Sequence, residues 1–477
     1  MEKIIGRREE MQLLQQALLS KEAGLVAVYG RRRVGKTFLI HSFFKEHLAF
    51  ELTGMYEGSL KAQLQQFSKS IQTATGSALT FAPPDNWINA FHALEQYLSA
   101  KNKKKKWVIF LDEFPWLDTR KSGFLPAFEH FWNAWASRQH NVLVIICGSA
   151  ASWMIRNIVN NKGGLHNRIT QKIRLLPFTL AETETYLKSR GVQLDQYQAL
   201  QVYMAFGGIP QYLKSVHKGD SATQAIEKAC FTKDGILTGE FNNLYNSLFE
   251  KADSHIKVVR ALAATGKGLT RQEIIEVCGL SSGGRATLML EELEESGFIR
   301  SAVPYEKAMK DAIYRLIDEY SLFYLKFMDK TRSSGKDIWI KLSAGASYKT
   351  WSGMAFEAVC MKHTAQIKKA LGIEGIQTTE SAWRYVPGKG AAGAQIDLLI
   401  DRADRCINIC EIKYYSAEYA IDKSYAVELQ RKLDVFKEKT KTKKILFVTM
   451  ITTYGIKENI YSAGLVQKSL SMDVLFA

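Results

Sequence analysis

The sequence lacks the features that mark membrane and secreted proteins. No apolar run among its 477 residues approaches the roughly 18 residues that a membrane-spanning helix needs. The N-terminal sequence MEKIIGRR also lacks the apolar segment of a signal peptide. We therefore expect a cytoplasmic protein with no membrane partner.

Cysteine is sparse and scattered along the chain. The cysteines form no C-x-x-C pair, and no histidine is placed to complete a zinc site with them. Scattered cysteines of this kind are typical of reduced thiols with a structural role, so zinc is not indicated. The six residues are Cys147, Cys230, Cys278, Cys360, Cys406 and Cys410.

The remaining composition is that of a folded protein with several domains. Hydrophobic residues make up 46% and charged residues 23% of the chain, which indicates a globular protein. At about 100–200 residues per domain, the length predicts about two to four domains. The net charge of +16 suits a polyanionic partner such as DNA, although the lysine-rich segment 101–106 is better explained as a solvated loop.

One short segment matches a phosphate-binding loop at every specified position. The pattern is G-x-x-x-x-G-K-[ST], in which glycines let the backbone wrap a phosphate and the following helix N-terminus attracts its charge. An apolar strand over 24–29 leads into the segment, and a helix over 36–44 leaves it. The segment is Gly30, Arg31, Arg32, Arg33, Val34, Gly35, Lys36 and Thr37.

This loop predicts an ATP or GTP site that also holds Mg²⁺. We expect Lys36 to pair with the β- and γ-phosphates and Thr37 to place its hydroxyl on the metal ion. A second motif supplies the carboxylates, because the apolar strand over 107–113 ends in Asp112 and Glu113. Asp112 would hold Mg²⁺ and Glu113 would orient the attacking water, although a strand that merely ends at a polar turn gives the same pattern.

Two further polar residues follow strands of the same alternating pattern. Ser149 ends a strand over 142–149, where it either senses the γ-phosphate or caps a helix over 150–158. Arg168 precedes a strand over 172–175 and could reach a nucleotide in its own or a neighbouring subunit, or lie on the surface. Helices over 179–190 and 194–206 then predict a helical lid over the nucleotide.

These motifs together resemble the archaeal-type ATPases of the AAA+/STAND group. The resemblance covers about the first half of the chain and implies ATP as the nucleotide and a conformational switch. The motifs that carry it are Gly6-Arg7 with Glu10, the phosphate loop, the sequence LDEFP at 111–115, Gly148-Ser149, Arg168 before the sequence IRLLPF at 173–178, and the sequence GGIP at 207–210.

The middle of the chain predicts a winged helix. A first helix over 255–265 is followed by a second that opens with the capping box of Thr270 and Glu273, and then by a third over 281–296. Strands over 298–303 and 313–316 follow. In the third helix Arg285 comes early, but four carboxylates come late, at positions 291, 292, 294 and 295. Carboxylates repel phosphates, so packing or partner binding is favoured over reading of DNA bases.

A second chemical site is predicted near the C-terminus. Strands over 393–400 and 407–413 can form a hairpin that places Asp397 directly across from Glu411, with Lys413 on the same face as Glu411. Two opposed carboxylates can hold Mg²⁺ against a scissile phosphate, and Lys413 can position the water. The alternatives are a polar edge of a solvated sheet and a degenerate domain that does not cleave.

The hairpin resembles the PD-(D/E)xK phosphodiesterase fold of restriction endonucleases. In that resemblance Glu357 matches an acidic helix position upstream, and Gln430 faces the site from the following helix. Archaeal-type ATPases commonly carry a C-terminal domain of this appearance.

The sequence thus predicts an α/β protein with four parts. They are a parallel-sheet ATPase domain (1–176), a helical lid (177–250), a winged helix (251–330) and a nuclease-like α/β domain (341–477). The first functional hypothesis is an ATPase with bound Mg²⁺ that regulates cleavage of nucleic acid. The second is an ATP-dependent signalling switch whose inactive C-terminal domain binds a protein partner, and either form could be a homo-oligomer.

Overall fold

The computed structural model describes most of the chain. The described residues are 3–78, 81–149, 151–159, 165, 167–249, 251–331, 337–385 and 393–477. They belong to two compact units, which we describe separately. The first unit is Met1–Pro177 with Asn243–Ala252, and the second is Phe178–Asn242 with Asp253–Ala477.

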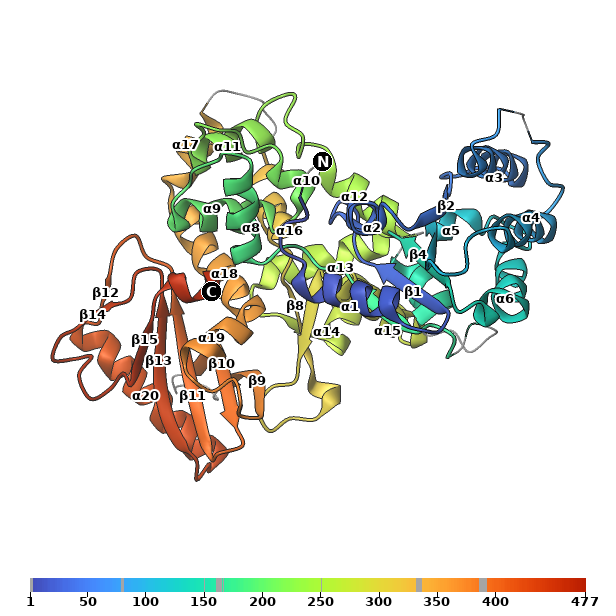
Figure 1. Cartoon of the computed structure of the whole chain (residues 1–477). Coiled ribbons are helices and arrows are strands. Elements are labelled where there is room, and N and C mark those ends of the chain that lie inside the picture. Colours follow the sequence, from blue (N-terminus) through green and yellow to red (C-terminus); the bar gives the residue numbers. More distant parts are fainter. Residues whose placement is uncertain are drawn as a thin grey trace. The chain divides into compact units, whose positions relative to one another are not determined.

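The first unit is built on a parallel sheet of five strands in the order β2-β3-β4-β1-β5 (Figure 1). All six residues of β1 are buried, as expected for a strand inside a sheet with helices on both faces. β4 lies between β1 and β3 and pairs with both in parallel. The strands are β1 (Gly24–Tyr29), β2 (Leu48–Thr53), β3 (Trp107–Asp112), β4 (Val142–Gly148) and β5 (Gln171–Arg174).

The helices of the first unit alternate with these strands, as the sequence predicts. α2 begins at Lys36, directly after the phosphate loop, and the predicted bounds of β1 and α2 are both confirmed. The helices are α1 (Arg8–Leu19), α2 (Lys36–Phe44), α3 (Leu60–Thr75), α4 (Trp87–Ser99), α5 (Phe114–Leu117), α6 (Phe124–Ala134), α7 (Ala151–Met154) and α12 (Glu240–Leu248), which continues from the second unit.

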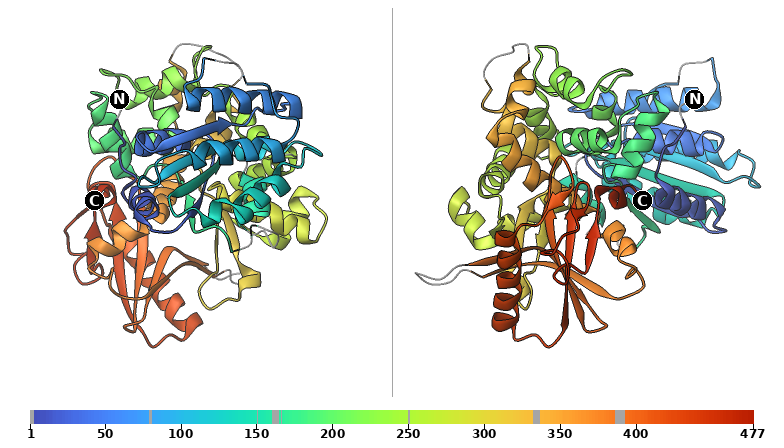
Figure 2. Two further views of the ribbon diagram at one scale, coloured as in Figure 1. Left: turned by 45° about the vertical axis from the view of Figure 1, so that its right-hand side comes forward. Right: turned by 90° about the vertical axis from the view of Figure 1, so that its left-hand side faces the viewer.

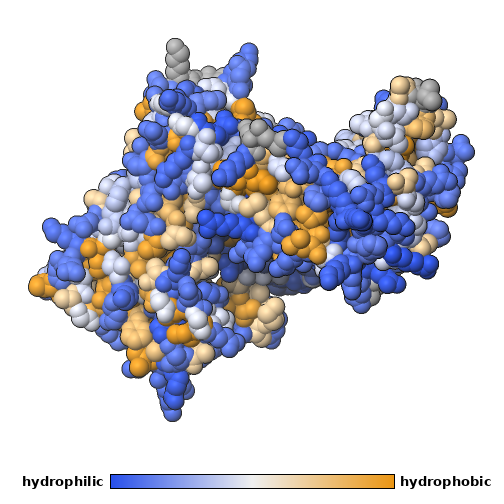
Figure 3. Space-filling view, in the orientation of Figure 1, coloured by the Kyte–Doolittle hydropathy of each residue, from blue (hydrophilic) through white to orange (hydrophobic). Residues whose placement is uncertain are grey.

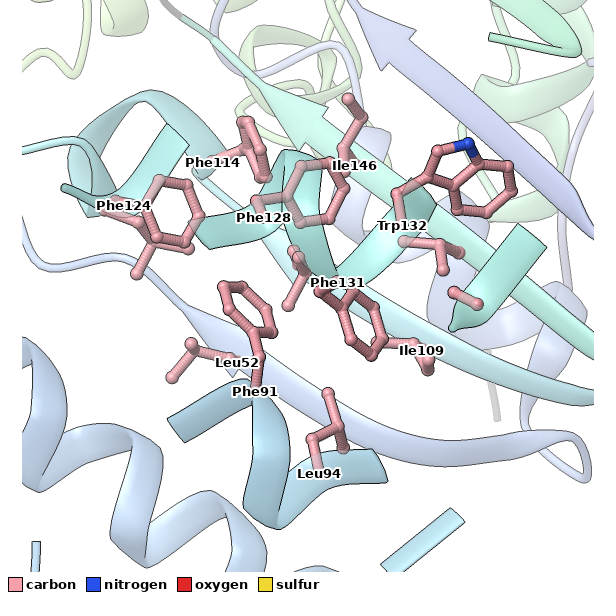
Figure 4. Packing of buried hydrophobic residues seen from close by; sticks show 14 of the residues in the cluster. Leu52, Phe91, Leu94, Ile109, Phe114, Phe124, Phe128, Phe131, Trp132 and Ile146 are labelled. Atoms are coloured by element: carbon pink, nitrogen blue, oxygen red, sulfur yellow. The ribbon is translucent and has the colours of Figure 1, made fainter. Parts of the chain in front are cut away.

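Aromatic rings fill the core between α4, α6 and the sheet (Figure 4). Phe91 stacks on Phe131 with ring centroids 5.0 Å apart, and Phe114 meets Phe124 and Phe128 edge to face. Such rings bury large apolar areas and prefer these offset or perpendicular geometries. The core fixes α5, which directly follows the predicted catalytic carboxylates, against the sheet.

The second unit begins with a helical segment. α8 opens with a capping box in which Thr179 and Glu182 bond each other's backbone N–H groups. After α9 the chain turns at Gly208, where a Cβ atom would lie 1.9 Å from the carbonyl oxygen of Phe178, so only glycine fits. The helices of this segment are α8 (Leu180–Ser189), α9 (Gln196–Phe206), α10 (Pro210–Leu213) and α11 (Ala222–Cys230).

Three helices and a three-stranded antiparallel sheet follow. The predicted capping box of Thr270 and Glu273 is confirmed, and Gly279 ends that helix in the left-handed conformation with φ of 61°. The strand order is β6-β8-β7. The elements are α13 (Ala252–Thr265), β6 (Leu269–Thr270), α14 (Arg271–Cys278), α15 (Gly284–Glu295), β7 (Ile299–Ala302) and β8 (Ile313–Leu316).

Two of the four carboxylates of α15 make hydrogen bonds to neighbouring elements of the second unit. Glu292 is buried and lies 2.9 Å from Nε2 of His255 on α13. Glu294 accepts hydrogen bonds from the backbone N–H and the hydroxyl of Ser301 on β7. Glu291 remains exposed. These contacts hold α15 against its neighbours, which agrees with a packing role.

The C-terminal part of the second unit is a five-stranded mixed sheet, orange to red in Figure 1, in the order β15-β13-β11-β10-β9. β9, β10 and β11 are antiparallel neighbours, and β13 and β15 run parallel to β11. α20 makes the crossover from β11 to β13 and lies along one face of the sheet (Figure 2). The strands are β9 (Thr378–Tyr385), β10 (Ala394–Arg402), β11 (Cys406–Lys413), β12 (Tyr419–Ala420), β13 (Ile445–Thr452), β14 (Ile456–Lys457) and β15 (Lys468–Leu470).

The C-terminal end of α18 joins the other parts of the second unit. Arg300 of β7 donates a hydrogen bond to the carbonyl of Met361, and Lys362 forms an ion pair with the buried Glu319, 2.7 Å apart. His363 accepts the first N–H of α8, from Leu180, at its Nε2 atom. The helices here are α16 (Glu319–Phe323), α17 (Ile338–Ser343), α18 (Ala346–Lys362), α19 (Thr364–Ala370) and α20 (Lys423–Thr440).

The surface is largely hydrophilic on the face shown in Figure 3, with hydrophobic residues in small groups. This is ordinary for a folded chain whose large apolar side chains are inside. Within the part of the chain that is described, no helix combines the length and apolar character that crossing a membrane requires.

The environment of His363 predicts a dependence of stability on pH. Its Nδ1–H donates to the carbonyl of Val359, so the ring is neutral, and burial lowers its pKa to about 4. The unfolded chain binds this proton more tightly than the folded protein does. The free energy of unfolding therefore keeps its full contribution from His363 above about pH 6.5, and it falls by on the order of 3 kcal/mol as the pH drops toward 4.

Urea unfolding of the wild type and of His363→Gln at about pH 7 and about pH 4.5 tests this prediction. We expect the variant to be less stable at neutral pH and to lose less stability on acidification. His217→Gln, at an exposed histidine of the same unit, is the control. Equal losses in wild type and His363→Gln would contradict the assignment.

Candidate active sites

The phosphate loop has the backbone that a phosphate cradle requires. Gly30 has φ of +151°, and a Cβ atom there would lie 2.3 Å from the carbonyl oxygen of Leu175, so the close approach of loop and β5 needs glycine. Gly35 has φ of +92°, which directs the chain into α2. Nζ of Lys36 donates to the carbonyls of Gly30 and Arg31, both at 3.0 Å, so the ammonium lies inside the turn of the phosphate loop.

The other loop residues differ in their exposure. Arg31 and Val34 are buried, with 1% of each side chain exposed, while Arg32 faces solvent and Arg33 is half-buried. Arg33 also adopts a left-handed conformation, with φ of 71°.

Arg7, which lies outside the phosphate loop in the sequence, binds the loop. The phosphate-loop motif alone does not predict this contact. Its guanidinium donates to the carbonyl of Val34 at 3.1 Å and to that of Leu176 at 2.7 Å. Arg7 is 5% exposed, and it adopts φ of 58° to start α1. The sequence signal is Gly6-Arg7 before a helix, and its contacts are to residues far along the chain.

The predicted Mg²⁺ ligands lie together at the ends of β1 and β3. The hydroxyl of Thr37 donates to Oδ2 of Asp112 at 2.7 Å, and Oδ1 of Asp112 accepts the N–H of Glu113 at 2.9 Å. Hydroxyl and carboxylate oxygens are the hard donors that Mg²⁺ prefers, so these residues fit the ion. Burial, reinforced by the charge of Asp112, raises the pKa of the neighbouring Cys147 thiol, which therefore stays protonated.

Ser149 holds the predicted catalytic carboxylate. Its hydroxyl donates to Oε2 of Glu113 at 2.6 Å, and its backbone N–H donates to the same oxygen at 3.2 Å. Because β4 lies between β1 and β3, the residue after β4 is placed beside both motifs. The predicted start of the following helix, Ala150, lies outside the described residues. Arg168 is exposed in the turn before β5, and its predicted contact with a nucleotide stays a prediction.

At the C-terminal site the predicted pairing of β10 and β11 is present. The register runs from Leu398 opposite Cys410 to Asp401 opposite Ile407, and its next step places Asp397 opposite Glu411. Oδ2 of Asp397 accepts the backbone N–H of Ile412 at 3.3 Å. The pairing of β10 with β9 is irregular between residues 396 and 399, where Asp397 lies.

Glu411 is fully buried and is held from α20. Its Oε2 accepts hydrogen bonds from Nζ of Lys432 at 2.7 Å and from the hydroxyl of Tyr425 at 3.3 Å. Its Oε1 has no hydrogen-bond partner among the described residues. Burial, followed by repulsion from Asp397, raises the pKa of Glu411.

The prediction that Gln430 of α20 faces the site is wrong. Gln430 is exposed and bonds Asp434 on the same helix, so it does not face the site. The inward face carries Tyr425, Leu429 and Lys432, at spacings of four and three residues, followed by the buried Phe436. This helical period was visible in the sequence and could have indicated Lys432.

Glu357 and Lys413 complete the group. Burial, together with repulsion from Asp397, raises the pKa of Glu357 on α18 to about 7, and the positive charge of Lys413 opposes this rise. Nζ of Lys413 also lies 5.3 Å from the ring centre of Tyr425. The structure therefore brings Glu357, Asp397, Glu411 and Lys413 into one electrostatic cluster.

This cluster fits a sparse Mg²⁺ site. Over the described residues, no group of three or more His, Cys, Asp or Glu side chains is arranged to hold a metal ion. Mg²⁺ often takes only one or two carboxylates and completes its shell with water and substrate phosphate. Asp397 and Glu411 match that donor set, and the unpartnered Oε1 of Glu411 leaves an oxygen available.

Comparison with known proteins identifies the first site. Residues 5–216 match the family described as an ATPase domain predominantly from Archaea. This segment is a P-loop ATPase domain. The match contains the phosphate loop, Asp112, Glu113, Ser149 and Arg168, and it supports ATP as the nucleotide.

Similar sequences occur in the archaeon Methanocaldococcus jannaschii. The uncharacterized protein MJECL04 is 24% identical over 370 residues, which cover 76% of this chain and 78% of that protein. The uncharacterized ATP-binding protein MJ0423 is 44% identical over 41 residues, which cover 9% of this chain and 70% of that protein.

Similar solved structures include two archaeal proteins. The Walker-type ATPase PABY2304 of Pyrococcus abyssi is 19% identical, with a TM-score of 0.49, and the match covers 68% of this chain and 96% of that one. The ORC2 protein of Aeropyrum pernix is 15% identical, with a TM-score of 0.43, and the match covers 72% and 96%.

The contact between Ser149 and Glu113 predicts a kinetic effect in the ATPase domain. In Ser149→Ala the carboxylate loses the hydroxyl that orients it, so we expect kcat for ATP hydrolysis to fall about tenfold. The affinity for ATP should change little, because the loop and Lys36 are intact. Steady-state hydrolysis and nucleotide titration measure the two effects, with Ser137→Ala, at an exposed position in the short 3-10 helix after α6, as control. An unchanged kcat would contradict the positioning role.

Proposed function

We propose that the protein couples ATP hydrolysis to Mg²⁺-dependent cleavage of phosphodiester bonds in nucleic acid. The observation that carries the second activity is the convergence of Asp397, Glu411 and Lys413 on one hairpin, with a buried, unpartnered carboxylate oxygen. The element order around them, α18, β9, β10, β11, α20 and β13, is consistent with the nuclease-like fold that the sequence resembles.

In the ATPase domain each residue takes a role suited to its position. Lys36 and the loop N–H groups bind the β- and γ-phosphates, and Thr37 and Asp112 hold Mg²⁺. Glu113, oriented by Ser149, positions the attacking water. Arg168 contacts nucleotide of its own or of a neighbouring subunit, and the second arrangement would make a homo-oligomer the active form.

At the C-terminal site the chain supplies ligands and one cation. Asp397 and Glu411 hold Mg²⁺, which when bound polarises the scissile phosphate. Lys413 orients the attacking water and stabilises the charge that develops on the phosphate. Glu357, with a pKa of about 7, can exchange a proton with solvent near neutral pH.

The elements between the two sites supply the coupling in this proposal. Residues 177–250 act as the helical lid and residues 251–330 as the winged helix, and ATP binding and hydrolysis change the contacts of the winged helix and thereby expose or align the C-terminal site. Because two carboxylates of α15 pack within the winged helix, against α13 and β7, packing or partner binding is favoured over reading of DNA bases.

A second function is favoured by one contact. The ammonium of Lys432 lies 2.7 Å from Glu411 and already neutralises the buried carboxylate. In a switch whose C-terminal domain only binds a protein partner, this ion pair would make the metal unnecessary. The two proposals therefore differ in whether Mg²⁺ binds and whether nucleic acid is cut.

Cleavage of labelled single- and double-stranded DNA in Mg²⁺, with and without ATP, tests the nuclease proposal. Asp397→Ala and Lys413→Ala should each lower the rate at least about a hundredfold, because both remove groups that act on the reacting phosphate. Asp404→Asn, in the turn at the other end of the hairpin, should cleave like the wild type.

Absence of cleavage by the wild type in every condition, with ATP still hydrolysed, would overturn the nuclease proposal in favour of the switch.

Lys36→Ala separates the two activities. The variant loses the ammonium that binds the phosphates, so we expect it to lose ATP binding and hydrolysis. If the sites are coupled, ATP should no longer change its rate of DNA cleavage. Nucleotide titration and the same cleavage assay measure this, and retained ATPase activity would contradict the assignment of the loop.

A further inference from the structure

A cavity of about 240 Å³ lies within the second unit, between the sheet β6-β8-β7 and the strands β9 and β10. It opens next to the C-terminal site, because Asp397 forms part of its wall. The polar residues of the wall that matter here are Arg300, Arg315, Thr364, Thr379, Ser381 and Asp397.

Arg315, which is half-buried, brings a positive charge to this cavity from β8. Its charged neighbours are Glu357 and Asp397, and one guanidinium nitrogen lies 3.8 Å from the sulfur of Met361. Burial lowers its pKa and these carboxylates oppose the decrease, but a guanidinium stays protonated at neutral pH. An arginine in this setting presents a rigid, weakly hydrated fork, the geometry that matches phosphate oxygens.

The wall also holds a hydrogen-bonding group without a partner. Ser381 is 7% exposed, and its hydroxyl has no hydrogen-bond partner among the described residues. A buried hydroxyl left unpaired costs free energy, so its presence beside a cavity points to a bound polar ligand. Thr364 and Thr379 add hydroxyl groups on the same wall.

Two other charged residues, Glu380 and Arg300, line the cavity. Glu380 forms an ion pair with Lys368 at 2.8 Å and accepts a hydrogen bond from Thr378. Arg300 donates one N–H to the carbonyl of Met361 and keeps its positive charge. The cavity thus combines two guanidinium groups and an unsatisfied hydroxyl with the carboxylate of Asp397 at one end.

We propose that this cavity binds a phosphate group of a single nucleic-acid strand, with Arg315 as its principal contact. The strand's role as substrate rests on the proposed function. The cavity, of about 240 Å³, is smaller than the roughly 300–1,000 Å³ of pockets that enclose small molecules, so it suits a single phosphate group and not a duplex. The sheet β6-β8-β7 then completes the substrate site of the C-terminal sheet.

Binding can be measured without cleavage. The probes are fluorescein-labelled single-stranded DNA and RNA 12-mers of one sequence, titrated in Ca²⁺ with the full-length protein and followed by fluorescence anisotropy. Gels confirm that the probe stays intact. Comparison of the two probes shows whether the phosphate comes from DNA or RNA.

Four variants test the wall of the cavity. Arg315→Met should weaken binding about tenfold and lower the salt dependence by about one counterion, while Arg315→Lys should lie between it and the wild type. Ala302→Leu fills the cavity without changing charge and should also weaken binding, and Ser381→Ala should do so about twofold. Arg405→Met, in the exposed turn between β10 and β11, is the matched control and should bind normally.

The outcomes separate this inference from the nuclease proposal. Arg315-dependent binding without cleavage in Mg²⁺ would support the cavity and remove the nuclease. Cleavage with equal affinity in wild type and Arg315→Met would overturn the cavity alone, and a wild type that binds neither probe would also overturn it. Thermal unfolding and unchanged ATPase activity check that Arg315→Met is folded. If it is not, Ala302→Leu and Ser381→Ala decide the question.

Discussion

The nucleotide site depends on one chain of hydrogen bonds that crosses the ends of three neighbouring strands. It runs from Thr37 through Asp112 and Glu113 to Ser149, and every link is set by the strand order. If β1 and β3 were adjacent, Ser149 would have no place beside Glu113. The sheet therefore positions the carboxylate of Glu113 as well as the phosphate loop.

The local parts of this arrangement could be predicted from the sequence. β1 and α2 have the predicted bounds because apolar runs and glycine positions are local signals. The capping box at Thr270 and the hairpin of β10 and β11 were predictable for the same reason, since each depends on residues a few positions apart. The comparisons confirm the ATPase domain, while the roles of the C-terminal residues remain predictions.

The contacts that hold distant segments together could not be predicted. Arg7 bonds a carbonyl 169 residues away, and Arg315 and Asp397, from two different sheets, line the same cavity. The motif Gly6-Arg7 marks Arg7 but does not show which carbonyls it binds, and nothing near Arg315 in the sequence distinguishes it from a surface cation. The prediction for Gln430 was wrong for another reason. It rested on resemblance, although the helical period of α20 favours Lys432 as the residue that faces the site.

The end of α18 has a consequence for how the second unit can move. This helix carries Glu357, which belongs to the acidic cluster, and Met361, whose carbonyl accepts a hydrogen bond from β7. At its end Lys362 pairs with Glu319, and the next residue, His363, bonds α8. Separating the pair of Lys362 and Glu319 would strand a buried charge, at a cost of about 3–5 kcal/mol. Because His363, directly after α18, accepts the first N–H of α8, the start of α8 and the helix that carries Glu357 are tied together at one buried hydrogen bond.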